Sequence, residues 1–185
     1  MAAATVETVG EKLSTIKVNG VRPSEKAVRK VAGRYNVELG NITTHNVLQL
    51  KKLNEAVFPV AYNDKFYIEV TSAGDLAKIA YFNDVVVGAV CCRYETMCDE
   101  KSLYIMTLGT LAPYRRYGVG KLLLDHVFEH CEKDPSIKRI CLHVQVNNTT
   151  ALEFYDKHGF ENKELCQNYY RLEPSEAYLL VKKIN

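Results

Sequence analysis

The sequence has little net charge and no long apolar run, and both absences limit what the protein can do. Its 24 lysines and arginines nearly balance its 22 aspartates and glutamates, for a formal net charge of +2. Such a charge gives no global field for nucleic acid or an anionic membrane. No segment approaches the roughly 20 apolar residues of a spanning helix, and Met1–Val9 lacks the pattern of a signal peptide. We therefore expect a soluble, cytoplasmic protein without a membrane partner, with the nucleus as an additional compartment.

The cysteines also lack the patterns that would indicate a metal site or a disulfide framework. No two of them have the C-x-x-C spacing of a zinc site, and they are too sparse for a secreted disulfide scaffold. The six are Cys91, Cys92, Cys98, Cys131, Cys141 and Cys166. We expect reduced thiols and no bound metal.

Length and composition fit one globular domain preceded by a different N-terminal segment. The chain has 185 residues, of which 47% are hydrophobic, so it can bury an ordinary core. Residues 1–38 contain scattered glycines and a basic stretch, and we predict a partly ordered extension there, followed by the folded domain at 39–185. A natural tail and an artificial addition both fit the extension. The basic stretch, Lys26, Arg29, Lys30 and Arg34, also suits a docking arm for ribosomal RNA.

From Thr43 onward, patterns typical of helices and of strands alternate. Thr43 or Thr44 can cap a first helix that Phe58-Pro59 ends, and Asn83-Asp84 is a hairpin signal between two apolar runs. We predict strands at 77–82, 85–93, 103–108, 139–145 and 177–181, helices at 121–131 and from Thr149 or Thr150 to Gly159, a charged turn at 95–101 and a polar loop through Tyr169 and Tyr170. This order predicts an α/β or α+β fold with a mixed sheet.

A glycine-containing loop lies between the predicted strand at 103–108 and the predicted helix at 121–131. Its Gly118 and Gly120 let the backbone approach a ligand closely, and successive N–H groups at a helix N-terminus bind anions. Arg115, Arg116 and Lys121 add positive charge. The spacing matches neither the nucleoside-triphosphate loop nor the dinucleotide fingerprint. From the residues alone, a plain glycine-rich turn remains an alternative to a phosphate site.

The spacing of Arg115, Gly118 and Gly120 resembles the Q/R-x-x-G-x-G/A signature of the Gcn5-related acetyltransferases. The resemblance implies a single domain with a mixed, mostly antiparallel central sheet flanked by helices. It also implies that the loop binds the pyrophosphate of acetyl-coenzyme A through Arg115, Arg116, Tyr117, Gly118, Val119, Gly120 and Lys121.

Five further motifs look like the NatE-type branch of this superfamily, which acetylates protein N-termini. They are Phe58–Tyr67, Tyr104–Gly109, Ala112–Arg116, Leu142–Gln145 and Asn168–Tyr170. The resemblance runs from Glu38 to the C-terminus, and the longer N-terminal extension carries none of these motifs.

The chemistry of acetyl transfer requires a neutral amine, because an ammonium group has no lone pair with which to attack. An α-amino group has a reference pKa near 8, so a moderate base suffices, and histidine titrates in that range. The resemblance implies that Tyr104 and His143 together position a water that takes the amine proton. Without it, the favoured interpretation of His143 is a structural histidine that bridges the core and the sheet edge, and Tyr104 indicates little more than strand packing.

The resemblance also assigns residues around the thioester. It implies that Tyr155 protonates the leaving thiolate and that Asn148 contacts the cofactor, although helix packing and helix capping explain the same two residues. Backbone N–H groups at Leu108 and Gly109 would polarise the thioester carbonyl.

Two aromatic loops are predicted to grip the acceptor. The resemblance places Phe58, Pro59, Val60 and Tyr62 on one loop, Tyr169, Tyr170 and Leu172 on the other, and Met106 in the pocket. It implies a preference for an initiator methionine followed by an apolar residue. The alternative is a set of core and surface aromatics. The segment 170–174 is one residue shorter than the family pattern, which makes Leu172 the weakest of these assignments.

The expected activity is acetyl transfer from acetyl-coenzyme A to the N-termini of nascent chains, and the resemblance implies association with the NatA catalytic and auxiliary subunits and, through them, with the ribosome. Fold alone does not choose the acceptor, so a protein lysine acetyltransferase is one alternative. A non-catalytic subunit of such a complex is the other, although Gly118, Gly120, Tyr104 and His143 are all present and favour an enzyme.

Overall fold

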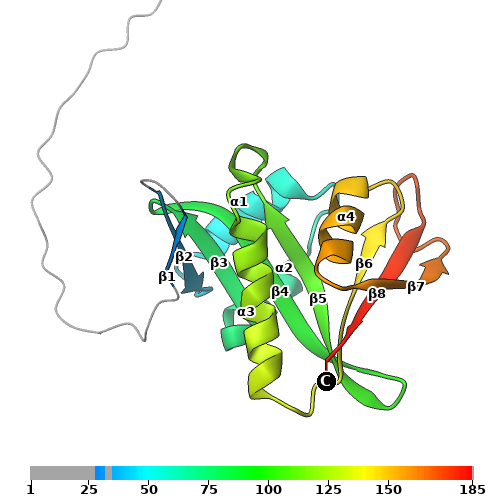
Figure 1. Cartoon of the computed structure of the whole chain (residues 1–185). Helices are drawn as coiled ribbons and strands as arrows, with labels where there is room; N and C mark the ends of the chain where they lie inside the picture. Colours follow the sequence, from blue (N-terminus) through cyan, green and yellow to red (C-terminus); the bar gives the residue numbers. More distant parts are fainter. Residues whose placement is uncertain (1–27, 32–34, 185) are drawn as a thin grey trace, which may run out of the picture.

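The computed structural model describes residues 28–31 and 35–184 (Figure 1). Over these residues eight strands form one sheet in the order β1-β2-β3-β4-β5-β6-β8-β7. The strands are β1 Val28–Val31, β2 Tyr35–Asn41, β3 Ala77–Phe82, β4 Val85–Met97, β5 Glu100–Thr110, β6 Arg139–Gln145, β7 Glu161–Cys166 and β8 Ala177–Lys183. The α-helices are α1 Val47–Val57, α2 Asp64–Thr71, α3 Val119–Lys133 and α4 Thr149–Lys157, with short 3-10 turns at Gly74–Leu76 and Ala112–Tyr114.

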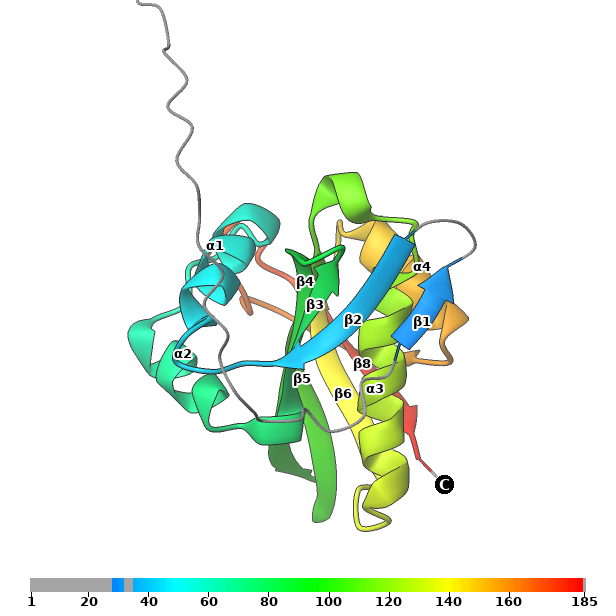
Figure 2. The same cartoon turned by 90° about the vertical axis from the view of Figure 1, so that its left-hand side faces the viewer.

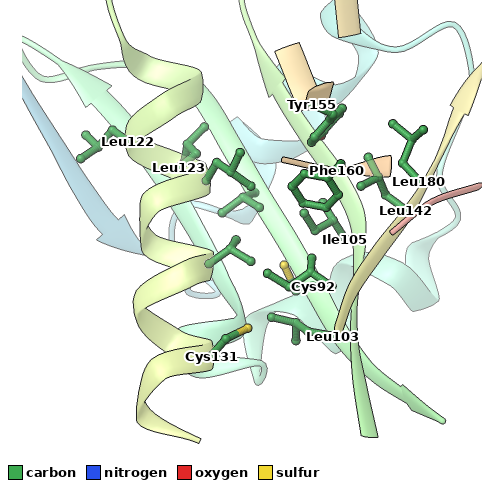
Figure 3. Close-up of a cluster of buried hydrophobic side chains, with 14 of the residues drawn as sticks. Cys92, Leu103, Ile105, Leu122, Leu123, Cys131, Leu142, Tyr155, Phe160 and Leu180 are labelled. Carbon is green, nitrogen blue, oxygen red and sulfur yellow. The ribbon is translucent and has the colours of Figure 1, made fainter. Parts of the chain in front are cut away.

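Helices cover both faces of the sheet. Figure 2 shows α1 and α2 on one face and α3 and α4 on the other. The core under α3 and α4 includes the fully buried Leu123, Leu124 and Ile140, and Figure 3 shows how side chains from β4, β5, β6, β8 and the two helices meet there. A second core, around Leu50 and Ile79, lies under α1 and α2. Two apolar layers therefore hold the sheet between them.

The sheet opens between β5 and β6. These are its one parallel pair among the described strands, and they pair only where Ser102–Tyr104 lie beside Arg139–Cys141. Beyond Tyr104 the two strands separate. The register between β4 and β5 also shifts, since Cys91 pairs with Thr107 and Cys92 with Ile105, leaving Met106 as an extra residue. A bulge of this kind bends a strand and increases its twist, so it helps turn the end of β5 away from β6.

Several predicted elements are confirmed. The strands at 77–82 and 139–145 have the predicted bounds, and Asn83 and Asp84 adopt the positive φ angles, 47° and 68°, that a two-residue hairpin turn requires. Gly159 follows α4 with φ at 79°, as a left-handed residue after a helix.

Other expectations were wrong or incomplete. The charged segment 95–101 is mostly strand, because β4 and β5 run on to a tight turn at Cys98-Asp99, where φ is 52° and 62°. Helices α1 and α4 begin after Asn46 and Asn148 rather than after the predicted threonines, and α3 begins at Val119. Strands β2 and β7 and helix α2 were not predicted. The predicted polar loop after residue 160 therefore begins only after Cys166.

The predicted boundary at residue 38 falls inside β2, which pairs with β3 from Val37 to Asn41. Of the basic stretch, Arg29 and Lys30 lie in β1, whereas Lys26 and Arg34 lie outside the described residues, as does all of 1–27. The role proposed for the extension stays a prediction.

All six cysteines lie in the described part of the chain, and all are free thiols. Among the described residues there is no helix that is long and apolar enough to span a membrane, and no group of three or more histidines, cysteines or acidic residues that could hold a metal ion.

Candidate active site

A pocket lies where β5 and β6 separate, with a volume of about 130 Å³. This is room for a few water molecules. It contains eleven residues of the predicted site: Phe58, Pro59, Val60, Tyr62, Met106, Leu108, His143, Asn148, Tyr155, Tyr170 and Leu172. The separated strands, α4 and two loops thus bring together residues from across the sequence.

Tyr104 and His143 are in direct contact beside this pocket. The Tyr104 hydroxyl lies 3.0 Å from His143 Nδ1 and 2.8 Å from the Tyr169 hydroxyl. The Tyr169 ring stacks on the imidazole, with 4.1 Å between ring centroids and 14° between the planes. Arg93 lies against the Tyr104 ring at 5.1 Å. The pairing of β5 with β6 at Tyr104 and Cys141 brings Tyr104 and His143 together, although 39 positions separate them.

The surroundings keep both groups neutral. Burial lowers the pKa of His143, against the smaller opposing effect of the Glu95 and Glu164 carboxylates. Burial and the hydrogen bond with Tyr169 raise the pKa of Tyr104 well above 10, so its hydroxyl stays protonated. Since Tyr104 has one proton, it donates to one of its two partners and accepts from the other.

Tyr155 and Asn148 lie on the opposite wall, at α4. Tyr155 is buried, lines the pocket, and has a pKa raised by burial. Asn148 caps α4 by accepting a hydrogen bond from the N–H of Ala151 at 3.2 Å, and it also lines the pocket. The capping role and the predicted cofactor contact are therefore compatible in one residue.

The predicted phosphate loop runs into the N-terminus of α3. Gly118 precedes this helix at a φ of 83°, a conformation that L residues rarely adopt, and nothing lies within 4 Å of where its Cβ would be. The first intrahelical bond runs from the N–H of Leu122 to Gly118, which leaves the N–H groups of the first turn free for an anion. Open space above free N–H groups fits the pyrophosphate of coenzyme A.

Side chains of this loop differ in their availability. Lys121 forms an ion pair with Asp125 at 2.6 Å, and Arg115 Nε donates to the Thr110 carbonyl at 3.3 Å. Tyr117 packs against Phe82 and is 43% exposed, whereas Val119 is buried in the core. Arg116 adopts a positive φ of 69°. The backbone and the two arginines are thus better placed for phosphate contacts than Lys121.

The acceptor loops form the rim of the pocket. Phe58 and Tyr62 are in edge-to-face contact at 6.0 Å, and Phe58 approaches β5 so closely that a Cβ on Gly109 would lie 2.9 Å from its ring. On the other side the Tyr170 hydroxyl donates to the His143 carbonyl at 3.4 Å, and burial raises the pKa of Tyr170 to about 12. Tyr169 stacks on His143 and is therefore placed with the Tyr104–His143 pair rather than in the pocket wall.

Six residues of the pocket were not predicted: Ile105, Thr107, Leu142, Val144, Gln145 and Ala151. Gln145 fixes the second acceptor loop, because its side-chain amide donates to the Pro174 carbonyl at 2.6 Å. Its place two residues after His143 put it on the same side of β6, a signal that could have identified it.

Comparison with known proteins gives the family. The family model described as "Acetyltransferase (GNAT) family" matches residues 47–160. The chain is 56% identical to N-alpha-acetyltransferase 50 of Danio rerio over 149 residues, covering 80% of this chain and 89% of that protein. The chain belongs to the acetyltransferase (GNAT) family. This membership confirms the predicted family, the fold class and the acetyl-CoA-dependent N-acetyltransferase activity.

Two further relatives of this acetyltransferase are similar over comparable lengths. It is 54% identical to a protein described as probable N-acetyltransferase san of Drosophila melanogaster, over 82% of this chain and 83% of that one. Its fold matches Arabidopsis thaliana Naa50, solved in complex with the bisubstrate analogue CoA-Ac-MVNAL, with a TM-score of 0.75, 47% identity, and coverage of 80% of this chain and 99% of that chain.

Proposed function

We propose that the protein transfers acetyl from acetyl-coenzyme A to the free α-amino group at the N-terminus of other proteins. The observation that carries this proposal is the small pocket between two aromatic loops, beside the Tyr104–His143 pair. A pocket of this shape suits the end of a chain, whereas a lysine inside a chain needs an open groove. The similarity to N-alpha-acetyltransferase 50 and to a structure with a peptide-bearing analogue supports the same acceptor.

In the proposed mechanism, acetyl-coenzyme A supplies the acetyl group as a thioester when bound. The first turn of α3 with Arg115 and Arg116 holds its pyrophosphate. The N–H group of Leu108, which points away from β4 into the gap between β5 and β6, polarises the carbonyl, whereas the N–H of Gly109 faces β4. Tyr155 gives a proton to the departing sulfur.

The proposed base is His143, acting through a water that it positions together with Tyr104. When His143 Nδ1 donates to the Tyr104 hydroxyl and Tyr104 donates to Tyr169, the lone pair of His143 Nε2 remains free. That nitrogen takes one proton from the ammonium group through the water, and the neutral amine nitrogen then attacks the acetyl carbon. As the C–S bond breaks, the second proton lost from nitrogen replaces the one that Tyr155 gives to the sulfur.

The proposed acceptor begins with methionine followed by an apolar residue. Phe58, Tyr62 and Met106 offer apolar surface for the methionine side chain, and Pro59, Val60 and Leu172 offer it for the second residue. Burial raises the pKa of Tyr62, so no ionised side chain opposes an apolar occupant there.

The test compares two peptides, one with a free Met-Leu terminus and one with that terminus blocked and an internal lysine, while coenzyme A release is followed. Turnover with the free terminus alone supports the proposal. Turnover with the lysine peptide alone contradicts it and favours a lysine acetyltransferase. Cofactor binding without turnover of either peptide favours a non-catalytic subunit.

We also propose a cytoplasmic location in association with the NatA catalytic and auxiliary subunits, as the family resemblance implies. Co-purification of tagged protein with those subunits and with ribosomes tests this, and recovery of the protein free of both in gentle lysates contradicts it.

A further inference from the structure

A second pocket lies on the other side of the first acceptor loop. It has a volume of about 430 Å³ and is lined by Lys51, Asn54 and Glu55 of α1, by the loop from Phe58 to Tyr62, and by Tyr67 of α2. Phe58, Pro59, Val60 and Tyr62 line both pockets. One loop is therefore the wall between the active-site pocket and this second pocket.

Asn54 is a polar residue at an apolar position of α1. It follows the spacing of Leu50, Leu53 and Val57, which is the buried face of the helix, and it is only 1% exposed. Its Nδ2 has no hydrogen-bond partner among the described residues. A buried donor without a partner lowers the stability of a protein, and such exceptions to the local pattern are expected at functional sites.

Asn54 lines the second pocket, where its unpaired N–H group can donate a hydrogen bond to a bound molecule. Because Nδ2 has no partner among the described residues, an occupant of the pocket can supply the missing acceptor. The partner that this donor needs is an acceptor oxygen.

The charges at the rim do not favour an ionic occupant. The Lys51 ammonium is paired with Asp64 at 3.1 Å and lies 5.4 Å from the centre of the Tyr67 ring. Glu55 is paired with Lys52 at 2.7 Å. The other walls are apolar or aromatic: Phe58, Pro59, Val60, Tyr62 and Tyr67. The site therefore suits a neutral group that combines apolar surface with a carbonyl oxygen.

We propose that the second pocket binds residues three to five of the acceptor polypeptide, with Asn54 donating to a backbone carbonyl of that segment. This rests on the proposed function, since it concerns the chain whose amino end lies in the active-site pocket. An extended chain advances roughly 3.4 Å per residue, so its third to fifth residues lie about 7–14 Å from the first and come within reach of a second pocket that shares this loop. Peptide groups carry no net charge, so they suit a rim whose charged side chains, Lys51 and Glu55, are already paired.

The test measures kcat and KM for two acceptors whose side chains and amidated C-termini are uncharged, Met-Leu amide and Met-Leu-Ala-Ala-Ala-Ala amide, with the wild type, Asn54→Leu and Asn54→Ala. In the wild type the longer peptide should have a KM lower by about five- to tenfold, the value of one hydrogen bond. Both variants should lose that advantage and keep the wild-type KM for Met-Leu amide. Gln49→Ala, a change at an exposed position of α1 outside the pocket lining, should keep the full length effect.

Each outcome decides the proposal. An equal length effect in the wild type and both variants overturns it, as does turnover of both peptides by the wild type with the same KM. If the wild type acetylates neither peptide, the proposed function itself fails and the subsite with it. Thermal melting separates folding from binding, because Asn54→Leu removes an unpaired buried donor and should melt at or above the wild-type temperature.

Discussion

The Tyr104 hydroxyl is the contact that joins the two groups proposed to act as the base. Tyr104→Phe keeps the ring against Arg93 but removes the bonds to His143 and Tyr169. We expect Tyr104→Phe and His143→Ala each to lower kcat by about 100-fold or more, because a positioned base contributes roughly 10²- to 10⁴-fold. Steady-state kinetics with a free Met-Leu peptide measure this. Near-normal turnover in both variants would show that the base lies elsewhere.

His143 should also set the acidic limb of the pH–activity profile. The imidazole accepts a proton only when it is neutral, and burial lowers its pKa below 6.5. Activity should therefore persist as the pH falls through 6.5 and drop only below it. The Glu164 carboxylate raises the pKa of His143, so Glu164→Gln should lower that pKa and move the acidic limb to lower pH.

The matched control for this shift is Glu153→Gln on the exposed side of α4. It should leave the limb of kcat/KM against pH where it is. A limb above pH 6.5 in the wild type, or a shift to higher pH in Glu164→Gln, would contradict the assignment to His143.

At the scale of elements, Gly109 lets α1 and its loop approach β5. A Cβ there would lie 2.6 Å from Val57 Cγ1 and 2.9 Å from Phe58 Cζ. Gly109→Ala should push Phe58 out of the acceptor pocket, raise the peptide KM several-fold and lower the free energy of unfolding by about 1–3 kcal/mol, as overpacking does. Kinetics and urea unfolding measure the two effects. The neighbouring Thr110→Ala should change neither, and an unchanged peptide KM in Gly109→Ala would contradict the role given to Phe58.

The elements that could be predicted carry their own local signals. Strand β3 is apolar, and Asn83-Asp84 after it favours a tight turn by itself. Strand β7 has no such signal, because Glu161–Leu165 are exposed at the edge of the sheet and form a strand only by pairing with β8. Helix α2 has eight residues and a capping asparagine, Asn63, whose side chain accepts from Phe66 N–H. That cap was a readable signal that the sequence analysis missed.

At the scale of the whole molecule, the site depends on the separation of strands β5 and β6 within the sheet. No local sequence pattern encodes this separation. The glycine loop was readable as an anion site because strand, glycines and helix follow one another in the chain. The meeting of Tyr104 with His143 depends instead on a parallel pairing only three residues long. From the residues alone the favoured interpretation of His143 is a structural histidine, and the family resemblance was needed to pair it with Tyr104.

Binding of acetyl-coenzyme A should stabilise the entire fold, because its proposed site joins β5, α3 and α4. At a concentration about 100 times Kd the gain is roughly 2.7 kcal/mol. For a chain of this size that corresponds to a rise in Tm of about 5–11 °C. Differential scanning calorimetry with and without the ligand measures the shift.

Substitutions in the glycine-containing loop before α3, and at Lys121 in its first turn, test which groups hold the phosphates of acetyl-coenzyme A. Replacing Arg115 and Arg116 together by glutamine should reduce the rise in Tm to about a third, since losing about 2 kcal/mol of charge-assisted contact raises Kd roughly 30-fold. Lys121→Gln should keep most of it, because the Lys121 ammonium is already paired with Asp125 at 2.6 Å. A rise in Tm abolished by Lys121→Gln but intact in the double variant would mean that Lys121 leaves Asp125 to bind the pyrophosphate. The order of the two effects therefore tests whether the Lys121–Asp125 ion pair persists when acetyl-coenzyme A binds.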